Sequence, residues 1–352
     1  MLGMAEGLRV LVNARNLRGA FTGIQRYTQE LLARLPYLRP ITPGKHLPGA
    51  LGQAWDQVVL PLRVGGEALF SPGNFGPLAC SRQVLTLHDI IPHDLPEAVR
   101  FSSGWARAWY EFLVPRLVRR VRRVITVSAF SRERILDWTG VEPERVVVIP
   151  NGVDPRFGPK DPQEVEARCL SLGLPRAYFL SVGILGPRKN QAGLLRAWHL
   201  ALPRLPEELW LLLAGPGDWE GFVRDHLEGR VPPRVRHLGV VSEADLPWLY
   251  AGATGFVLPS LYEGFGLPAL EAMASGIPVV VSATTAFPEV VGEAGLLVDP
   301  LDLEAIAHAL VRLAEDASLR RELARKGLAR AQGFTWERTA QETWRILQEA
   351  LF

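Results

Sequence analysis

The stretch GFVLPSLYEGFGLPALEAMASGIPVVVSA, residues 255–283, contains a complete strand–loop–helix–strand unit. The apolar run at 255–260 predicts a strand. Pro268 suits the first position of a helix, where the missing N–H of proline costs nothing, and Gly276 ends that helix. A second apolar run, 277–283, predicts another strand. Strands that are apolar on both faces and joined by a helix indicate a parallel βαβ unit.

The same alternation extends along the chain. Before residue 151, strands are predicted at 8–14, 68–72, 84–89, 123–128 and 145–150, and helices at 23–35, 104–121 and 130–138. After residue 163, strands are predicted at 178–183, 209–215 and 235–240, and helices at 190–202, 221–229 and 242–253, with more helix from residue 303. Residues 151–163 are rich in Gly, Pro and Asp, which favours a linker. We therefore expect two doubly wound α/β domains.

The composition describes a globular protein, with 48% hydrophobic and 22% charged residues. A net charge of +2 gives no reason to expect nucleic acid as the main partner. The two cysteines, Cys80 and Cys169, lie far apart and fit a reduced compartment. The start of the sequence does not predict a signal peptide, and no apolar run reaches the ~18 residues of a membrane span. We expect a cytoplasmic protein that could lie peripherally at the inner face of the membrane.

Residues 104–124 predict a basic amphipathic helix. Its arginines are Arg107, Arg116, Arg119, Arg120, Arg122 and Arg123. Such a helix could rest on anionic lipid headgroups. It could also pack on the domain with a solvated basic face, and the sequence favours this second interpretation.

Two acids, Glu263 and Glu271, flank the Gly-Phe-Gly of the opening stretch. Gly264 and Gly266 allow the backbone to approach a ligand closely. The first helical turn suits a phosphate, whereas carboxylates repel phosphate but accept hydrogen bonds from hydroxyl pairs. One interpretation therefore assigns one acid to ribose hydroxyls and the other to a sugar. The alternative is that Glu271 complements the helix dipole and Glu263 is a solvated turn residue.

A pair of cations, Arg188 and Lys189, follows a strand and a Gly-rich turn in SVGILGPRKNQ, residues 181–191. The fork of an Arg and the point charge of a Lys can together neutralise a diphosphate. The alternative is a solvated charged turn with Asn190 as a helix N-cap. We favour the diphosphate site, because the same domain also carries the glycine-rich loop with two acids.

The first domain offers polar groups after its own strands. His88 could donate to a developing negative charge or contact a sugar hydroxyl, and the alternative is a strand end with His88 bonded to backbone. Gly19 and Gly23 lie in a strand-to-helix loop, where the N–H of Gly23 could contact a diphosphate.

Several of these motifs occur together in one known family. EGFGLPALE is an E-x7-E motif, and the chain also carries GILGPRKN, NGVD, LHDIIP, FTGIQRYT and TTAFPEVVGEAGLLVDPLD. Over nearly its whole length the sequence resembles the retaining family-4 glycosyltransferases. The resemblance implies the GT-B fold, with two Rossmann-like domains facing across a cleft. It places the acceptor-side domain at 1–155, completed by a last helix at 336–352, and the donor-side domain at 156–335.

The resemblance also implies roles for individual residues. In the donor-side domain, Glu271 would bind the donor ribose, Glu263 the transferred sugar, and Arg188 and Lys189 the diphosphate. Backbone groups would complete the donor site, at Gly264, Phe265, Gly266 and Leu267 for sugar and phosphates and at Val241 for the base.

In the acceptor-side domain, His88 would contact the sugar and Gly23 would lie near the diphosphate. His88, Arg188, Lys189 and Glu263 are thus the expected catalytic residues. No Asp-x-Asp follows a strand, and the resemblance implies no metal and no cofactor. Gln25 stands where the family often has Gly, which puts the choice of acceptor in doubt.

The expected activity is retaining transfer of a hexose from a nucleotide-diphosphate sugar to a hydroxyl acceptor. The stretches GIQRYT and SPGNFGP favour mannose and hence GDP-mannose, with UDP- and ADP-sugars as alternatives. The acceptor would belong to cell-surface polysaccharide or glycolipid synthesis and could be lipid-linked. A sugar-nucleotide epimerase of the same fold and a non-catalytic nucleotide-sugar-binding protein are the alternative functions.

Overall fold

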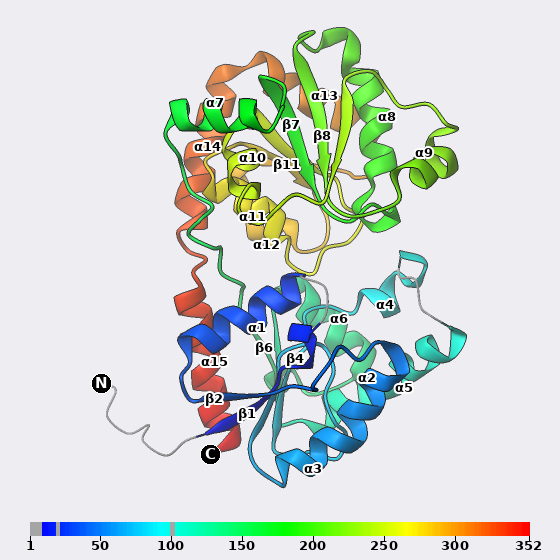
Figure 1. Ribbon diagram of the computed structural model, residues 1–352, viewed down its shortest axis with the longest axis vertical. Helices are drawn as coiled ribbons and strands as arrows, with labels where there is room; N and C mark the ends of the chain where they lie inside the picture. Colours follow the sequence, from blue (N-terminus) through cyan, green and yellow to red (C-terminus); the bar gives the residue numbers. More distant parts are fainter. Residues whose placement is uncertain (1–8, 19–21, 99–102) are drawn as a thin grey trace. The chain divides into compact units, whose positions relative to one another are not determined.

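The computed structural model describes residues 9–18, 22–98 and 103–352, so Gly19 lies outside the described residues. The chain divides into two compact units, one of Met1–Gly152 with Thr335–Phe352 and one of Val153–Phe334 (Figure 1). Each unit contains a six-stranded sheet whose paired strands are all parallel. Two doubly wound α/β units are what the alternation of strands and helices predicts.

The N-terminal unit has the strand order β2-β1-β3-β4-β5-β6. The strands are Val10–Asn13 (β1), Leu38–Ile41 (β2), Leu69–Ser71 (β3), Gln83–Thr86 (β4), Arg123–Thr126 (β5) and Val146–Val148 (β6). The sequence did not predict β2, whose short LRPI segment contains a proline. It pairs only with β1, at the sheet edge, where a proline is tolerated.

Helices cover both faces of this sheet. Helices α1 (Gly23–Arg34) and α15 (Trp336–Leu351) share one core with alternate residues of the strands, including Val12 and Phe70. The intervening strand residues, such as Leu85 and Val124, point to the opposite face of the sheet and pack against α5 (Gly104–Arg120) and α6 (Ala129–Thr139). Shorter segments also belong to this unit: α2 (Gly49–Ala54), the π-helix η2 (Trp55–Val59), α3 (Leu60–Val64) and α4 (Ile91–Asp94).

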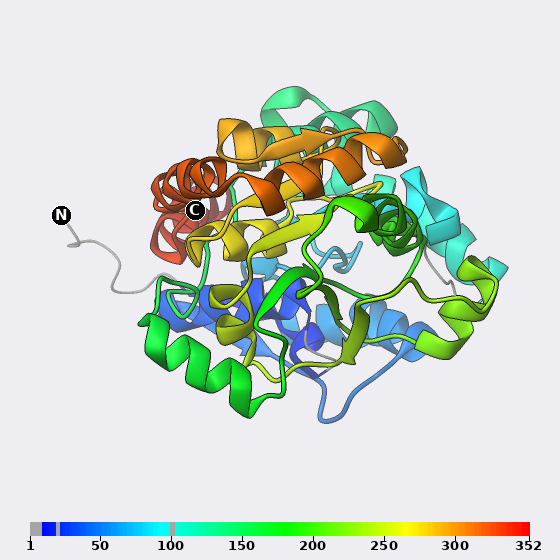
Figure 2. The same cartoon turned by 90° about the horizontal axis from the view of Figure 1, so that it is seen from above.

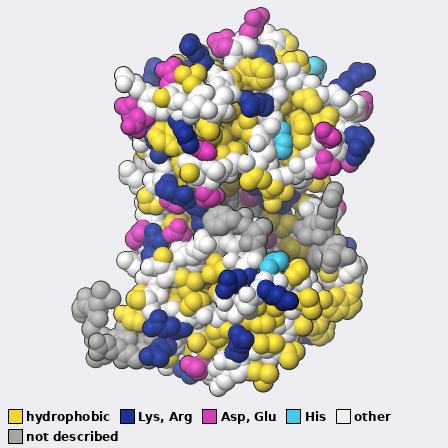
Figure 3. All heavy atoms as spheres, in the orientation of Figure 1, with side chains coloured by type: hydrophobic (Ala, Val, Ile, Leu, Met, Phe, Trp, Pro, Cys, Tyr) yellow, Lys and Arg dark blue, Asp and Glu magenta, His cyan; other side chains and the backbone are white. Residues whose placement is uncertain are grey.

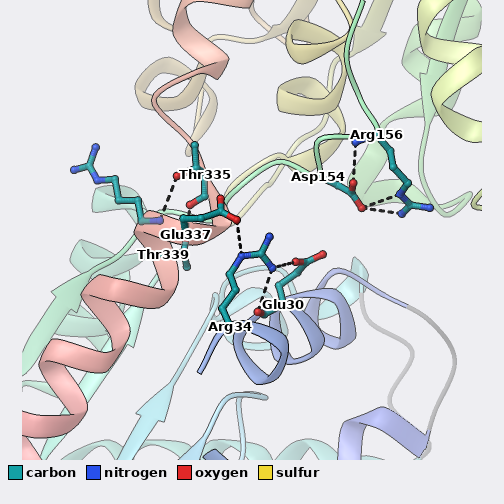
Figure 4. Close-up of polar contacts among 8 residues, drawn as sticks. Glu30, Arg34, Asp154, Arg156, Thr335, Glu337 and Thr339 are labelled. Atoms are coloured by element: carbon teal, nitrogen blue, oxygen red, sulfur yellow. Dashed lines mark hydrogen bonds and ion pairs between the residues drawn. The ribbon is translucent and has the colours of Figure 1, made fainter. Parts of the chain in front are cut away.

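Helix α15 joins this unit although it is last in the sequence. Thr335 caps its N-terminus, and Glu337 accepts a hydrogen bond of 2.8 Å from Nε of Arg34 on α1 (Figure 4). Arg34 also pairs with Glu30 on its own helix. The hydroxyl of Thr339 donates to the carbonyl of Pro150 at 2.7 Å, which joins α15 to the segment after β6. The fully buried ring of Trp336 adds apolar packing.

The C-terminal unit has the strand order β12-β11-β10-β7-β8-β9. The strands are Ala177–Val182 (β7), Leu209–Ala214 (β8), Val235–Gly239 (β9), Gly255–Leu258 (β10), Val279–Ser282 (β11) and Leu296–Val298 (β12). The sequence did not predict β12, which has only three residues.

Helices again lie on both faces of the sheet (Figure 2). Helices α8 (Gln191–Ala201) and α13 (Leu303–Glu315) share one core, and α10 (Leu246–Ala251) packs beside α11 (Leu267–Ala274) and α7 (Pro162–Ser171). The remaining helices are α9 (Trp219–Leu227), α12 (Phe287–Val291) and α14 (Ala317–Ala331).

Two predictions of helix bounds were wrong. The helix predicted at 242–253 begins only at Leu246. The hydroxyl of Ser242 instead accepts the N–H of Asp245 and donates to its carboxylate, and these bonds hold a turn before the helix. The linker predicted at 151–163 ends at Asp161, whose carboxylate caps α7.

Candidate active site

The loop between β10 and α11 depends on a glycine. Gly266 precedes the helix with φ of 95°, a left-handed conformation that side chains rarely adopt. A Cβ atom at Gly266 would lie 2.6 Å from Cε1 of Phe287. Pro268 is the second helical residue, one position later than predicted. The glycine therefore fixes where the free N–H groups of the first turn of α11 lie.

Glu263 is the centre of a buried ionic cluster. Its carboxylate lies 2.6 Å from Nζ of Lys189 and 3.0 Å from Nη1 of Arg188. The hydroxyl of Ser260 donates to the same carboxylate at 2.9 Å. Arg188 and Lys189 follow β7 and Glu263 follows β10, and the two strands pair in parallel, so their carboxyl ends meet at one sheet edge.

The surroundings of Glu263 keep it ionised. Only 6% of the residue is exposed, and burial alone would raise the pKa of its carboxyl. The charges of Lys189 and Arg188 outweigh burial and lower the pKa of Glu263 to about 2. Burial also lowers the pKa of Lys189, and the ion pair with Glu263 opposes that shift. Glu263 is therefore a carboxylate at neutral pH, and the alternative of a solvated turn residue is wrong.

Lys189 reaches Glu263 because its stem crosses a glycine. A Cβ atom at Gly183, where φ is 157°, would lie 2.9 Å from Cε of Lys189. The next residue, Asn190, has φ of 53° and makes no side-chain cap for α8. Its amide instead donates to the carbonyl of Pro300 at 2.7 Å. The alternative of a solvated turn capped by Asn190 is therefore wrong as well.

Both cations thus contact a carboxylate within the unit. Two cations and one carboxylate leave a net charge of +1 among these three residues, and the nearby charge of Glu271 also acts on Lys189. Arg188 also donates to the carbonyl of Tyr262 at 2.9 Å, which orients its guanidinium. The cluster still attracts an anion, but the carboxylate shares the cations that the sequence assigned to a diphosphate.

The second acid of the motif is also buried. Glu271 is 7% exposed and accepts a hydrogen bond of 3.0 Å from the hydroxyl of Tyr250, on α10. It lies beyond the first turn of α11, so the proposed role as a dipole partner is weakened. Sequence reasoning missed Tyr250 and Ser260. Of these two residues, only Ser260 could have been found from the sequence, because a serine at the end of a strand precedes the carboxylate of Glu263 by three residues.

The other expected donor-binding residues lie on the same sheet edge or beside it. Phe265 is buried, with its ring edge on Phe334 at 5.9 Å between centroids. Gly264 is buried and Leu267 is half-buried. Val241 is half-buried and follows β9, which is one edge strand of this sheet; β12 is the other.

His88 belongs to the N-terminal unit and is 6% exposed. Its Nε2 lies 2.9 Å from the carbonyl oxygen of Pro72, which can only accept, so Nε2 carries the proton. Burial lowers the pKa of His88 to about 4, and the bond to Pro72 opposes this shift. Neutral His88 then offers Nδ1 as an acceptor. This geometry supports contact with a hydroxyl and argues against donation to a negative charge.

The residues around Gly23 have structural contacts of their own. Gly23 is the first residue of α1. The side chain of Gln25 is buried, donates to the carbonyl of Asn16 at 2.9 Å and contacts the hydroxyl of Thr22. Gln25 therefore holds the segment before α1 in place.

Two family models match the chain. Residues 69–157 match the model of glycosyltransferase family 4, and residues 176–316 match that of group 1 glycosyl transferases. The O-antigen chain mannosyltransferase B of Escherichia coli is 36% identical over 275 residues, which are 77% of this chain and 71% of that protein. The chain belongs to the family-4 glycosyltransferases. This glycosyltransferase is also 33% identical over 279 residues to the MMP alpha-(1->4)-mannosyltransferase of Mycolicibacterium hassiacum, covering 76% of the chain and 65% of the relative.

Solved structures confirm the GT-B fold of this glycosyltransferase. The structure of Anabaena HepE in complex with UDP and glucose matches with a TM-score of 0.78 at 21% identity. The match covers 97% of this chain and 99% of the HepE chain. WaaG, a glycosyltransferase involved in lipopolysaccharide biosynthesis, has a TM-score of 0.75 at 18% identity, with 96% and 99% covered. Among the described residues, no helix is long and apolar enough to cross a membrane. Within the same ranges, no group of three His, Cys, Asp or Glu residues could hold a metal ion.

Proposed function

We propose that this enzyme transfers a mannosyl residue from GDP-mannose, with retention of anomeric configuration, to a hydroxyl of a cell-surface polysaccharide or glycolipid. Two of the relatives are named as mannosyltransferases, which supports mannose as the sugar. A structural neighbour binds UDP-glucose, so a UDP-sugar is the main alternative donor. A lipid-linked acceptor is part of the proposal.

The buried cluster of Glu263, Lys189 and Arg188 is the observation that supports transfer chemistry best. A carboxylate fixed by two cations and Ser260 is preorganised to accept hydrogen bonds from hydroxyls of the transferred sugar. The net charge of +1, with the N–H groups at the start of α11, can stabilise the diphosphate as it leaves. In this proposal Glu271 holds the ribose, and no metal is needed.

The proposed step breaks the bond between the anomeric carbon and the diphosphate oxygen. The acceptor oxygen bonds to the anomeric carbon on the same face, and its proton passes to the departing phosphate oxygen. The products are the glycoside and the nucleoside diphosphate, so atoms and charge balance. Glu263 acts here as a hydroxyl-binding group, because a carboxylate paired with two cations is a weak nucleophile and, with a pKa of about 2, no proton donor.

A thermal-shift screen over GDP, UDP, ADP and their sugars tests the donor first. A ligand that binds only the folded state raises the melting temperature, and GDP-mannose should give the largest shift. NMR of the product formed with a mannoside acceptor should then show an α linkage from the α donor. A larger shift with UDP-glucose would replace the donor, and a β product would refute retention.

The two alternative functions are separated by incubation without acceptor. A sugar-nucleotide epimerase would produce an epimerised nucleotide sugar in an NMR time course. A binding protein would leave the donor intact for as long as it is observed. We expect slow hydrolysis to free nucleoside diphosphate and sugar, because water can replace the acceptor hydroxyl.

A further inference from the structure

One side of helix α5 in the N-terminal unit carries exposed aromatic rings. Trp105 and Phe112 expose 60% and 44% of their surface. Trp105 stacks on Trp109 at 5.6 Å between centroids, and Trp109 stacks on Phe112 at 5.7 Å. The guanidinium of Arg116 lies 3.8 Å from the ring centre of Phe112 and continues the row. Spacings of three and four residues place these side chains on one side of the helix.

A neighbouring helical segment extends this apolar surface. The indole N–H of Trp109 donates to Oε1 of Gln53 at 3.1 Å, which places α2 beside α5. Exposed aliphatic side chains follow on α2, η2 and α3, at Leu51, Val58 and Leu62. In Figure 3 hydrophobic side chains gather at the lower right, over the region where Figure 1 labels α2 and α5. We call the exposed side chains of α2, η2, α3 and α5 the α5 face.

Three arginines lie at the C-terminal end of the same side of α5. Arg116, Arg119 and Arg120 line a shallow depression of about 550 Å³ together with Leu78 and Ala79. Each guanidinium donates to a backbone carbonyl oxygen, at distances between 2.7 and 2.9 Å. Within the described parts of the chain, none of the three pairs with a carboxylate. A guanidinium has five N–H groups, so each retains donors for a phosphate.

The exposed charges of the α5 face are mostly positive. Segments Gly49–Val64 and Gly104–Arg120 contain only two acids, Asp56 and Glu111. Asp56 is fully buried, and Glu111 bonds to Nδ1 of His93 at 2.9 Å. Apart from Glu111, whose side chain is 32% exposed, the exposed charges on these segments are arginines, beside exposed tryptophan, phenylalanine and leucine. This combination complements a surface that is both apolar and anionic.

We propose that the α5 face docks on an anionic phospholipid bilayer. Trp105, Phe112 and Leu62 enter the interface between headgroups and acyl chains, where amphipathic aromatic rings are favoured. Arg116, Arg119 and Arg120 receive lipid phosphates in the depression. The docking surface belongs to the N-terminal unit and the cluster around Glu263 to the C-terminal unit, so the proposal does not depend on which nucleotide sugar is the donor.

Vesicle co-sedimentation of the full chain, without donor, tests the proposal. The enzyme should pellet with vesicles of phosphatidylcholine and phosphatidylglycerol and far less with phosphatidylcholine alone. Each arginine near an anionic surface contributes about fivefold to binding, so Arg116→Gln/Arg119→Gln/Arg120→Gln should bind on the order of 100-fold more weakly. The corresponding Arg→Lys triple variant should retain binding, because the charge is kept. Raising the salt to about 1 M should release the wild type, since screening then acts within about 3 Å.

Matched variants elsewhere control for charge and for surface hydrophobicity. Arg224→Gln/Arg321→Gln/Arg325→Gln changes the net charge equally on exposed residues of the C-terminal unit and should bind like the wild type. Trp105→Ser/Phe112→Ser should release the enzyme from vesicles, whereas Leu200→Ser/Leu301→Ser, a pair at least as exposed, should not. Melting temperatures verify that each variant is folded.

The proposal is overturned if the folded wild type stays in the supernatant with anionic vesicles, or if the arginine triple variant binds like its control. It is also overturned if the wild type is a dimer that Trp105→Ser/Phe112→Ser dissociates, since a second copy would then cover the face. Donor binding is measured without vesicles, so failure of the proposed function is recognised separately.

Discussion

The ion pair between Lys189 and Glu263 should stabilise the C-terminal unit, and Lys189→Met tests this with a side chain of similar length. Both side chains are 8% exposed, so the variant leaves a buried carboxylate with one cation fewer. Removing one partner of a buried pair costs about 3–5 kcal/mol. Arg188 remains 3.0 Å from Glu263, which favours the lower end of that range. The lowered pKa of Glu263 has the direction expected for a stabilising pair, and Arg188 and Ser260 share in that shift with Lys189.

A second Lys–Glu pair in the same unit provides the control. Lys326 lies 2.7 Å from Glu322 on α14, nearly the separation of the buried pair, but the side chains are 36% and 53% exposed. Lys326→Met should leave the stability unchanged within error, because exposed pairs contribute little. Burial, and not the distance between the charges, then explains the difference.

Native-state hydrogen exchange is the suitable assay, because the two units need not unfold together. Peptides from β7 and β10 report the free energy of opening of the C-terminal unit. Glu263→Gln and the double variant complete a cycle, in which the double variant should lose about 2 kcal/mol less than the sum of the single variants. A loss below about 1 kcal/mol for Lys189→Met, or strictly additive effects, would show that the pair does not stabilise the unit.

Further predictions address other residues of the proposed site. Glu271→Gln keeps an oxygen that accepts the hydrogen bond of Tyr250 but removes the charge. Donor affinity measured by calorimetry should therefore fall about 10- to 100-fold, at an unchanged melting temperature. An affinity equal to that of the wild type would exclude a ribose-binding role for Glu271. His88 binds its proton less readily when folded, with a pKa of about 4 against 6.5, so stability should fall by about 3 kcal/mol from pH 7 to pH 4. His88→Gln should lack this loss in urea unfolding, and an identical pH dependence would contradict the assignment. Gly266→Ala should lower the melting temperature and abolish transfer, because its Cβ meets Phe287 and its φ of 95° is strained; a variant as stable as the wild type would show that the loop adapts.

The amino-acid pattern alone is sufficient to predict the class of fold and the residue types of the site. Strands apolar on both faces, alternating with helices, are sufficient to predict parallel sheets, because only a sheet covered on both sides buries them. Glycine and proline marked the loop and helix around residues 260–276 from local backbone preferences alone. The edge strands β2 and β12 were not predicted, because segments this short show no clear periodicity.

The pairing of the site residues, in contrast, follows from the three-dimensional fold. Lys189 and Glu263 are separated by 74 positions, and they meet because β7 and β10 are neighbours, an order that no local pattern specifies. The tautomer of His88 likewise depends on the carbonyl of Pro72 in another segment. On α5, the sequence favoured a solvated basic face, but the structure exposes Trp105 and Phe112. Periodicity predicts a helix, whereas the side that faces solvent is decided by what the rest of the fold covers.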